Sequence, residues 1–367
     1  MKFVCSRDSI LSEISIGQEI ISSRNTLSIL SNVLLETHDD VLTIKATDLK
    51  VSFETQIPVE TGESGNTTVY CDKFLSILRS LPEGDIEFDQ QDERLDIRPL
   101  FKKIDFQLKS IASDKFPEFQ VVGNDQYFEL SQKDFVEMIG QTIFAVSDDE
   151  TRYFMNGVYM ENQDGKLMLV ATDGRRLSYM ENDVSESIPA FSGVIIPPKI
   201  LSMIRRLSSE EGSISVAVTD KHVFFEMDSK RLTSNLIEGQ FPDYNRVIPE
   251  HQENEVVVNR DELNEALNRV SLLVEQKSRR VFCSINENTL LLHSEESEIG
   301  VAREEISCEY TGPEISIALN YRYLIDPMTI IEDDSISIRF TDAKKAISLT
   351  STEEKGYVHI IAPMQLD

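Results

Sequence analysis

The sequence predicts an α+β protein built from three repeated domains, each with antiparallel sheets and two helices. A short apolar strand, a helix-capping residue and an amphipathic run occur together at Ser6, Ser131 and Asn259, which lie 125 and 128 residues apart. A second helix is predicted to begin 65, 66 and 61 residues after these caps. Each second helix is followed by a strand of alternating apolar and polar residues, which is typical of an antiparallel sheet with one solvated face.

Shorter segments repeat at the same spacing. Ala-Thr-Asp occurs at 46–48 and 171–173, and Phe-Pro-acid-aromatic occurs at 116–119 and 241–244. Several features that keep one register indicate repeated structural units, and such repeats constrain a fold more strongly than any single motif. We therefore predict three domains, at 1–127, 128–253 and 254–367.

The predicted helices begin at good capping residues. A Ser or Asn side chain at the N-cap can accept a hydrogen bond from a free backbone N–H of the first turn. Pro327 lies seven residues after the cap Asn320, where it removes an N–H and crowds the carbonyl of Tyr323. We expect that helix to kink or end early. The six helix segments are predicted at 6–24, 71–81, 131–144, 197–207, 259–280 and 320–331.

The charge is unevenly distributed. The net charge of −28 argues against nucleic-acid binding, which normally shows a basic footprint. The six helix segments, however, hold 14 basic and 11 acidic residues, so that the acidity lies in the strands and loops. This distribution suits a helix-lined surface that meets phosphates weakly and without base readout. From the charge alone, however, an ordinary acidic protein with solvated helix faces is the favoured interpretation.

Motifs of the common enzyme classes are absent from the sequence. There is no phosphate-binding loop, dinucleotide-binding motif, zinc-protease motif or nucleophile elbow, and the histidines and cysteines lack metal-ligand spacing. We therefore expect no catalytic residues, no cofactor and no metal, and we expect the four cysteines to be reduced core residues. The run 148–150 is expected to be a solvated acidic loop, and 173–176 a tight turn in which Gly174 takes a positive φ.

The N-terminus lacks the apolar segment of a signal peptide, and no apolar run is long enough to span a bilayer. We expect a cytoplasmic protein without a membrane partner.

Six motifs in order resemble the bacterial DNA polymerase III beta subunit family, the DNA sliding clamps, over the whole chain. They are Arg-Asn-Thr-Leu at 24–27, Thr-Arg-Tyr-Phe-Met-Asn-Gly-Val at 151–158, Ala-Thr-Asp-Gly-Arg-Arg-Leu at 171–177, Phe-Pro-Asp-Tyr-Asn-Arg-Val-Ile-Pro at 241–249, Asn-Tyr-Arg-Tyr-Leu at 320–324 and the tail Ile-Ala-Pro-Met-Gln-Leu at 361–366.

The resemblance implies a non-catalytic processivity factor, in which two chains join head to tail into a ring with helices inside and sheets outside. Twelve helices, each roughly 10 Å across, would leave a hole of roughly 28 Å, enough for a duplex of about 20 Å. The implied partners are double-stranded DNA, held without sequence preference, the polymerase III alpha subunit, the clamp loader, and other polymerases and repair proteins that bind through short peptide motifs.

The resemblance also implies site residues. Phe106 and Leu108 would meet Leu272 and Leu273 of a second chain at the dimer interface, and Arg24 and Tyr153 would contact DNA. The helix prediction adds inner-face candidates at Lys73, Arg79, Lys199, Arg205, Arg206 and Arg279. Arg176 and Arg246 are expected at the rim of a peptide pocket. The residues of this pocket are Met155, Thr172, Gly174, Arg175, Arg176, Leu177, Pro242, Arg246, Val247, Tyr323, Ala346, Ile360, Ala362, Pro363, Met364 and Gln365.

The tail departs from the family's usual Met-Pro-Met-Arg-Leu: Ala362 and Gln365 replace a Met and an Arg, and Asp367 follows. Position 175 often carries His and position 155 often carries Leu, where this chain has Arg and Met. These departures bear on the affinity for partners. Two alternatives of other classes remain: a metal-assisted hydrolase that uses Asp148, Asp149 and Glu150, and an acidic scaffold without a role on DNA.

Overall fold

The structure is a computed structural model, and it describes residues 1–21, 28–123, 126–184, 188–189, 191–209, 211–352 and 356–365. The chain forms two compact units. One comprises Met1–Ser131 with Glu211–Leu236, and the other comprises Gln132–Glu210 with Ile237–Asp367. Each unit contains one continuous sheet in which the strand pairs are antiparallel.

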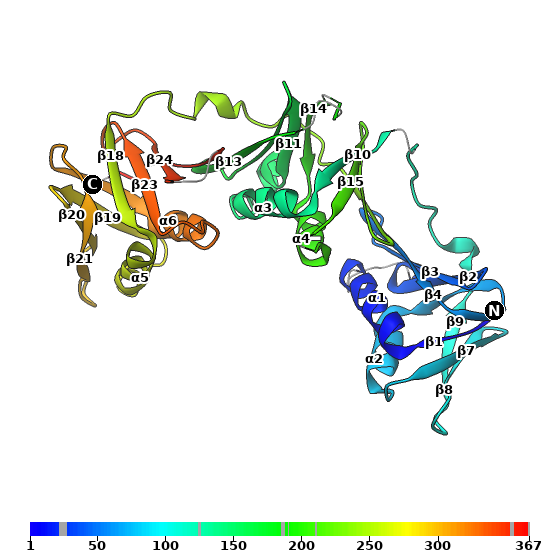
Figure 1. Ribbon diagram of the computed structural model, residues 1–367. Helices are drawn as coiled ribbons and strands as arrows, with labels where there is room; N and C mark the ends of the chain where they lie inside the picture. The colour runs from blue at the N-terminus through cyan, green and yellow to red at the C-terminus, as the bar shows by residue number, and fades with distance from the viewer. Residues whose placement is uncertain are drawn as a thin grey trace. The chain divides into compact units, whose positions relative to one another are not determined.

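The first unit contains a 13-stranded sheet and two helices. Its strand order is β10-β15-β16-β17-β4-β3-β2-β6-β9-β8-β7-β1-β5. The helices α1 (Arg7–Ile20) and α2 (Cys71–Ser80) pack against each other, as Figure 1 shows. The strands are β1 (Lys2–Ser6), β2 (Asn32–His38), β3 (Val41–Thr47), β4 (Val51–Pro58), β5 (Glu60–Glu63), β6 (Gly65–Tyr70), β7 (Asp85–Gln91), β8 (Arg94–Pro99), β9 (Phe106–Ile111), β10 (Phe128–Ser131), β15 (Ser213–Val218), β16 (His222–Met227) and β17 (Lys230–Asn235).

The second unit contains a 12-stranded sheet of order β14-β11-β12-β13-β25-β24-β23-β18-β21-β20-β19-β22. Two helix pairs accompany it: α3 (Gln132–Ile143) with α4 (Pro198–Leu207), and α5 (Arg260–Ser271) with α6 (Tyr321–Met328). The strands are β11 (Val158–Gln163), β12 (Lys166–Thr172), β13 (Arg176–Asp183), β14 (Phe191–Ile196), β18 (Asn254–Asn259), β19 (Arg280–Asn286), β20 (Thr289–Ser294), β21 (Arg303–Glu309), β22 (Ile315–Asn320), β23 (Ser335–Phe340), β24 (Ile347–Ser351) and β25 (Tyr357–Ile361).

The predicted fold class is confirmed: the chain has three domains of antiparallel sheets, with two helices in each repeat. In the first domain the amphipathic helices bury their apolar faces against the sheet, because this removes apolar surface from water. Phe3 of β1 stacks on Phe88 of β7 with ring centroids 4.7 Å apart, and Phe74 of α2 meets Phe88 edge-on at 6.0 Å. The boundaries 1–127, 128–253 and 254–367 stay a prediction.

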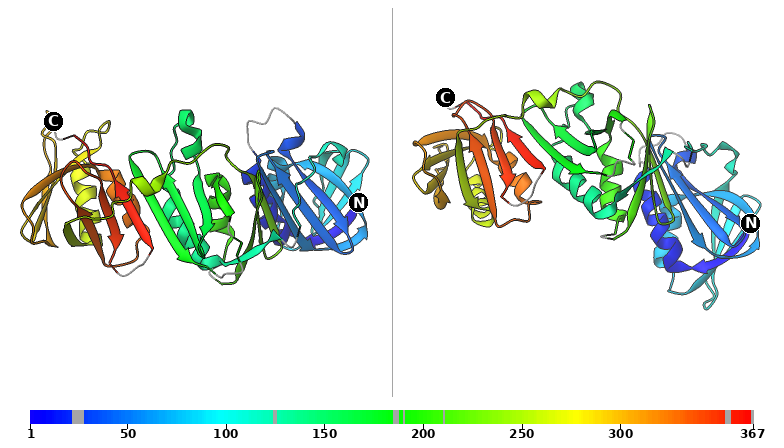
Figure 2. Two further views of the ribbon diagram at one scale, coloured as in Figure 1. Left: turned by 90° about the horizontal axis from the view of Figure 1, so that it is seen from above. Right: turned by 45° about the horizontal axis from the view of Figure 1, so that its top comes forward.

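Strand pairing continues across successive repeats. Strand β17 of the second repeat pairs with β4 of the first, in the register Ser234 to Val51. Strand β25 of the third repeat pairs with β13 of the second, in the register Ile361 to Arg176. Figure 2 shows the red strand β25 beside the green strand β13 in both views. The first half of one repeat therefore pairs with the second half of the next.

The helix starts agree with the prediction, but one cap and two helix ends do not. Asn259 and Asn320 accept hydrogen bonds from the backbone N–H groups of Glu262 and Arg322. The Ser6 side chain makes no such bond, although the next N–H, that of Arg7, donates to the carbonyl of Gly84.

The predicted segments 6–24 and 259–280 are too long, since α1 ends at Ile20 and α5 at Ser271. After α5 the chain turns, and Arg279 takes a φ of +54° that no helix allows. In α6 the helix ends one residue after Pro327, as predicted.

The prediction of reduced core cysteines agrees with the structure. Cys5, Cys71, Cys283 and Cys308 are buried free thiols, and burial raises the pKa of the Cys283 thiol to about 12, so that it stays protonated and inert. None of the helices in the described ranges is long and apolar enough to cross a membrane.

Candidate partner-binding pocket

An apolar pocket of about 180 Å³ opens in the second unit, beside the junction of β13 and β25. The structure brings eleven of the sixteen predicted pocket residues around it. Asp243 and Tyr244 also line it, and sequence reasoning missed both as pocket residues. The lining residues are Met155, Thr172, Gly174, Arg175, Arg176, Leu177, Pro242, Asp243, Tyr244, Val247, Ala346, Ile360 and Ala362.

A tight turn between β12 and β13 forms one wall. The Thr172 hydroxyl accepts from the Gly174 N–H at 3.0 Å and donates to the Arg176 carbonyl at 2.6 Å. Asp173 Oδ1 accepts from the N–H groups of the next two residues, at 2.9 and 3.0 Å. Gly174 takes a φ of +86°, and a Cβ there would lie 2.6 Å from an Arg152 nitrogen. The prediction of a tight turn with positive φ is confirmed, and glycine is the residue that this turn accommodates.

The equivalent turn in the first domain has the same hydrogen bonds but a different residue at its tip. The Thr47 hydroxyl accepts from the Leu49 N–H, and Asp48 accepts from the N–H groups of Lys50 and Val51. Leu49 adopts a φ of +73° and is 54% exposed. The duplicated turn thus carries a bulky side chain where the pocket has Gly174.

The Arg176 side chain is largely buried and joins several structural elements. The prediction of an exposed cation at the rim is therefore corrected. The side chain is only 10% exposed. The guanidinium pairs with Asp173 at 3.1 Å and with Asp326 of α6 at 2.5 Å, and it donates to the Phe144 carbonyl at 2.6 Å. It also lies over the Tyr323 ring, 4.6 Å from the centroid. These partners satisfy its charge, so that Arg176 fixes β13 against α6.

His359 lies in the same buried network. Its Nε2 is 3.2 Å from the Tyr323 carbonyl, and its ring is 5.4 Å from that of Phe144. Burial, together with the positive charge of Arg176, lowers the pKa of His359 to about 3. The imidazole is therefore neutral at neutral pH, and its Nε2–H donates to the carbonyl.

This pKa predicts a loss of stability on mild acidification. The unfolded imidazole binds a proton near pH 6.5, whereas the folded one does so only near pH 3. The contribution of the neutral His359 to the free energy of unfolding is therefore complete above pH 6.5. It is lost as the pH falls below this value, by up to about 1.4 kcal/mol per pH unit. We expect His359→Leu to flatten the dependence of the urea midpoint on pH between 6.5 and 5. The exposed control His251→Leu should retain it, and an unchanged slope in His359→Leu would contradict this assignment.

Aromatic residues support the wall formed by 241–247. The Tyr244 hydroxyl donates to Glu161 at 2.5 Å, and the Tyr159 hydroxyl donates to the same carboxylate at 3.0 Å. Tyr159 stacks on Phe241 at 4.8 Å. Burial and the hydrogen bond to Glu161 raise the pKa of Tyr159 to about 12, so that both phenols remain donors. The wall is therefore held from behind by packed rings and one carboxylate.

Five predicted pocket residues are not in the lining. Arg246 is 83% exposed and pairs at 2.8 Å with Asp243, which lines the pocket, and its place at the rim stays a prediction. Tyr323 carries the Arg176 guanidinium on its ring. The tail runs onward from Ala362, where the Met364 N–H donates to the Ala318 carbonyl at 2.8 Å. Pro363, Met364 and Gln365 are not among the residues that line the cavity, and they follow Ala362 towards β22.

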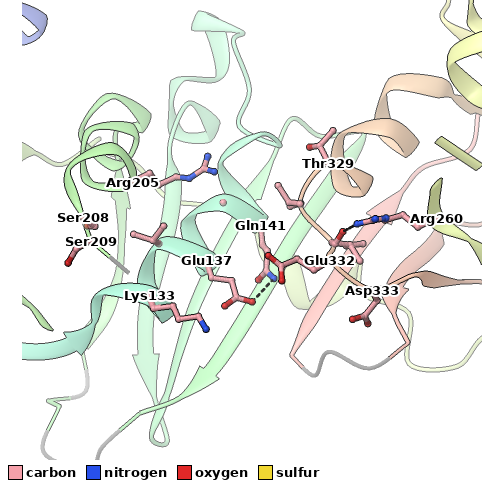
Figure 3. Close-up of a pocket in the computed structure, with 14 residues that line it drawn as sticks. Lys133, Glu137, Gln141, Arg205, Ser208, Ser209, Arg260, Thr329, Glu332 and Asp333 are labelled. Carbon is pink, nitrogen blue, oxygen red and sulfur yellow. Dashed lines mark hydrogen bonds between the residues drawn. The ribbon is translucent and has the colours of Figure 1, made fainter. Parts of the chain in front are cut away.

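A second, more open cleft of about 1010 Å³ lies among the helices of the same unit (Figure 3). Arg205 of α4 and Lys133 of α3 extend into it from one side, and Glu332 and Thr329 lie on the other. Within the described part of the chain, neither Lys133 nor Arg205 forms an ion pair. Lys133 was not among the predicted basic contacts.

The other candidate contacts are dispersed. Lys73 and Arg79 are exposed on α2, Lys199 and Arg206 lie on α4, Arg279 precedes β19, and Tyr153 is 53% exposed. Arg24 lies outside the described residues. In the run 148–150, Asp149 accepts from the Thr151 N–H and pairs with Arg152, so that it caps a 3-10 turn; these two partners lower its pKa.

The four predicted interface residues differ in exposure. Leu272 is 79% exposed at the end of α5, and Leu273 is half-buried and would lie 3.7 Å from a Cβ at Gly300. Phe106 and Leu108 of β9 are half-buried and pack against the core of the first domain.

A repeated three-domain fold, with a small apolar pocket and scattered basic side chains, defines a modular binding protein of the clamp class. The family models of the DNA polymerase III beta subunit match in succession: the N-terminal domain at 1–120, the central domain at 129–243 and the C-terminal domain at 245–365. The beta sliding clamp of Treponema pallidum is 46% identical and that of Escherichia coli K12 is 29% identical, with both chains of each pair covered in full.

Solved structures agree. A sliding clamp from Pseudomonas aeruginosa has a TM-score of 0.94 at 28% identity, and the Caulobacter crescentus clamp has 0.94 at 31%, each with complete coverage of both chains. The latter holds polyethylene glycol at a region that its description relates to β-motif tethering. The chain belongs to the DNA polymerase III beta subunit family, the bacterial beta sliding clamps. Its function is that of a sliding clamp, a processivity factor and not an enzyme.

Proposed function

We propose that two copies of this chain form a head-to-tail ring around duplex DNA in the cytoplasm, and that the pocket beside β13 and β25 captures peptides of the polymerase and other partners. The observation that carries the ring is the strand pairing between repeats. Strands β4 and β13 each pair with the second half of the following repeat, through β17 and β25.

The same pattern suggests how the strand edges left at the two ends of the chain, those of β21 and β9, could pair between two copies. Strand β21 occupies in the third domain the place of β4 and β13, and β9 occupies in the first domain the place of β17 and β25. Among the described residues, 303–307 pair only with β20, and 106–109 pair only with β8. An unpaired edge is a template for another strand. The third domain of one copy would thus continue into the first domain of the next.

If the registers of the two internal junctions hold at these edges too, residues 300–304 of one copy would lie opposite 104–108 of the other. Phe106 and Leu108 would then lie near Leu273, which covers Gly300. The charged residues near these edges have partners within their own chain. Arg98 pairs with Asp96 and Asp105, and Glu304 pairs with Arg269. Apolar packing and strand hydrogen bonds therefore supply most of the proposed interface.

The proposed contact with DNA is weak and independent of sequence. The basic candidates on α2 and α4, together with Arg279 before β19, are dispersed charges rather than a shaped surface, which suits phosphates and permits sliding. The cleft of Figure 3 adds Lys133 beside Arg205 to the predicted set. In a chain of net charge −28, such dispersed cations would bind phosphate without a large basic patch.

The ring predicts a topological result. Once placed on circular DNA by a clamp loader, the protein should remain bound at a salt concentration that abolishes its direct binding, because direct contacts are electrostatic and enclosure is not. Cutting the circle once should release it. Gel filtration of loaded circles, before and after a restriction cut, measures this.

The control is a circle with protein roadblocks on both sides of the cut, from which release should be prevented. Release from intact circles at the same rate as from cut ones would contradict the ring.

The proposed partner site is the pocket because its chemistry suits a short extended peptide. Leu177, Ile360 and Val247 offer apolar surface, and Met155 can adapt to varied side chains. Arg175 and Arg246 lie exposed at its rim, where they can bind acidic groups or carbonyls of a partner. The proposed partners are the polymerase III alpha subunit, the clamp loader, and other polymerases and repair proteins.

A further inference from the structure

The C-terminal tail is fixed at three points. The Ala362 N–H donates to the Arg175 carbonyl at 2.9 Å, and the Met364 N–H donates to the Ala318 carbonyl of β22 at 2.8 Å. The third point is a side chain, since Arg280 Nη1 donates to the Gln365 carbonyl at 3.0 Å. The first contact adjoins the pocket, and the other two lie further along the tail.

Arg280 is itself held in place. Its Nη2 pairs with Glu295 at 2.5 Å, and its guanidinium lies 5.3 Å from the centre of the Phe282 ring. Phe282 stacks in turn on His293 of β20, with centroids 4.9 Å apart and an interplanar angle of 10°. The Arg280 side chain is only 15% exposed. A guanidinium that is stacked on one face and paired at one edge loses little entropy when it binds a carbonyl.

We propose that Arg280 is a positioning residue for the C-terminal tail, with Glu295 and Phe282 orienting its guanidinium. By holding the Gln365 carbonyl, Arg280 keeps 363–365 against β22, so that the tail continues the wall that Ala362 begins. The inference rests on the proposed function, in which partner peptides extend from the pocket along this tail. Its structural part, the order of the tail, can be measured without any peptide.

The test compares Arg280→Gln with Lys277→Gln in the full-length protein. Lys277 is exposed three residues earlier and loses the same charge. Hydrogen exchange, followed by mass spectrometry on a C-terminal fragment, reports the Met364 amide that donates to Ala318. We expect exchange at least about tenfold faster in Arg280→Gln and unchanged in Lys277→Gln, because a lost charge-assisted hydrogen bond accounts for about a tenfold change. Arg280→Lys should be intermediate, since an ammonium can reach the carbonyl but cannot pair in a fork with Glu295.

The affinity for a polymerase-derived peptide, measured by calorimetry, should fall about tenfold in Arg280→Gln and stay constant in Lys277→Gln. Unchanged exchange in Arg280→Gln would overturn the inference, whatever the peptide does. Faster exchange with unchanged affinity would support the role of Arg280 in ordering the tail, and it would overturn the place of the tail in the proposed partner site.

Discussion

Replacing Leu272 and Leu273 together by alanine is expected to convert the dimer into folded monomers. Leu272 is 79% exposed and Leu273 half-buried, so that their truncation removes little from the core of the third domain. In the proposed dimer both would be buried against Phe106 and Leu108, and each truncation would cost about 1.5–3 kcal/mol of association. These losses correspond to roughly two to four orders of magnitude per interface, and because the proposed ring closes through two such interfaces, the dissociation constant should rise by at least that much.

Analytical ultracentrifugation across a dilution series measures this, with circular dichroism as the check on folding. Val121→Ala is the matched control, because Val121 is also apolar and 79% exposed. A double variant that sediments as a dimer at nanomolar concentration would refute the interface as placed. A monomer that no longer loads onto circular DNA would link the interface to the ring.

Removing residues 363–367 is expected to leave a folded dimer that binds a polymerase peptide at least about tenfold more weakly, since a few contacts carry most of the energy of such sites. The deletion spares the pairing of β25 with β13 and the buried Ile360. Val247→Asp should have a similar effect from the opposite wall, because Val247 lines the pocket and is 51% exposed.

Calorimetry with the peptide decides this prediction, and Val121→Asp provides the control for an added surface charge. Leu177→Ala would be a poor probe: this side chain is 3% exposed within a core cluster, and its truncation would destabilise the fold by about 2–5 kcal/mol. Full peptide affinity in the truncated protein would exclude the tail from the site.

The repeats explain why so much of the fold could be predicted. A cap, an amphipathic run and an alternating strand are local signals, and their threefold recurrence removed most of the ambiguity that each has alone. Helix ends were predicted less well, because they depend on distant partners. Arg279 leaves helical geometry, and its carbonyl accepts from the Tyr321 N–H, 42 residues along the chain. No local pattern encodes that contact.

The same distinction applies to the pocket. The turn around Gly174 is local and was predicted. The role of Arg176 depends on its ion pair with Asp326 of α6. The residue was expected at the rim, but its side chain is largely buried and links β13 to α6. Tyr244 was overlooked because its position is set by Glu161 and by the stack of Tyr159 on Phe241, contacts that join separate strands and loops.

In the proposed dimer, the contrast between Gly174 and Leu49 would set how many partners can bind at once. Both residues occupy the tip of the same hydrogen-bonded turn, yet only Gly174 leaves its wall open beside Met155, while Leu49 extends a bulky side chain from the tip. The pocket beside Gly174 would occur twice in the proposed dimer. Two partners could then bind one ring at the same time, and a third could bind only after one of them dissociates. The partner that occupies each pocket would therefore depend on the concentrations and residence times of the competing partners. Partners would compete for two equivalent binding sites.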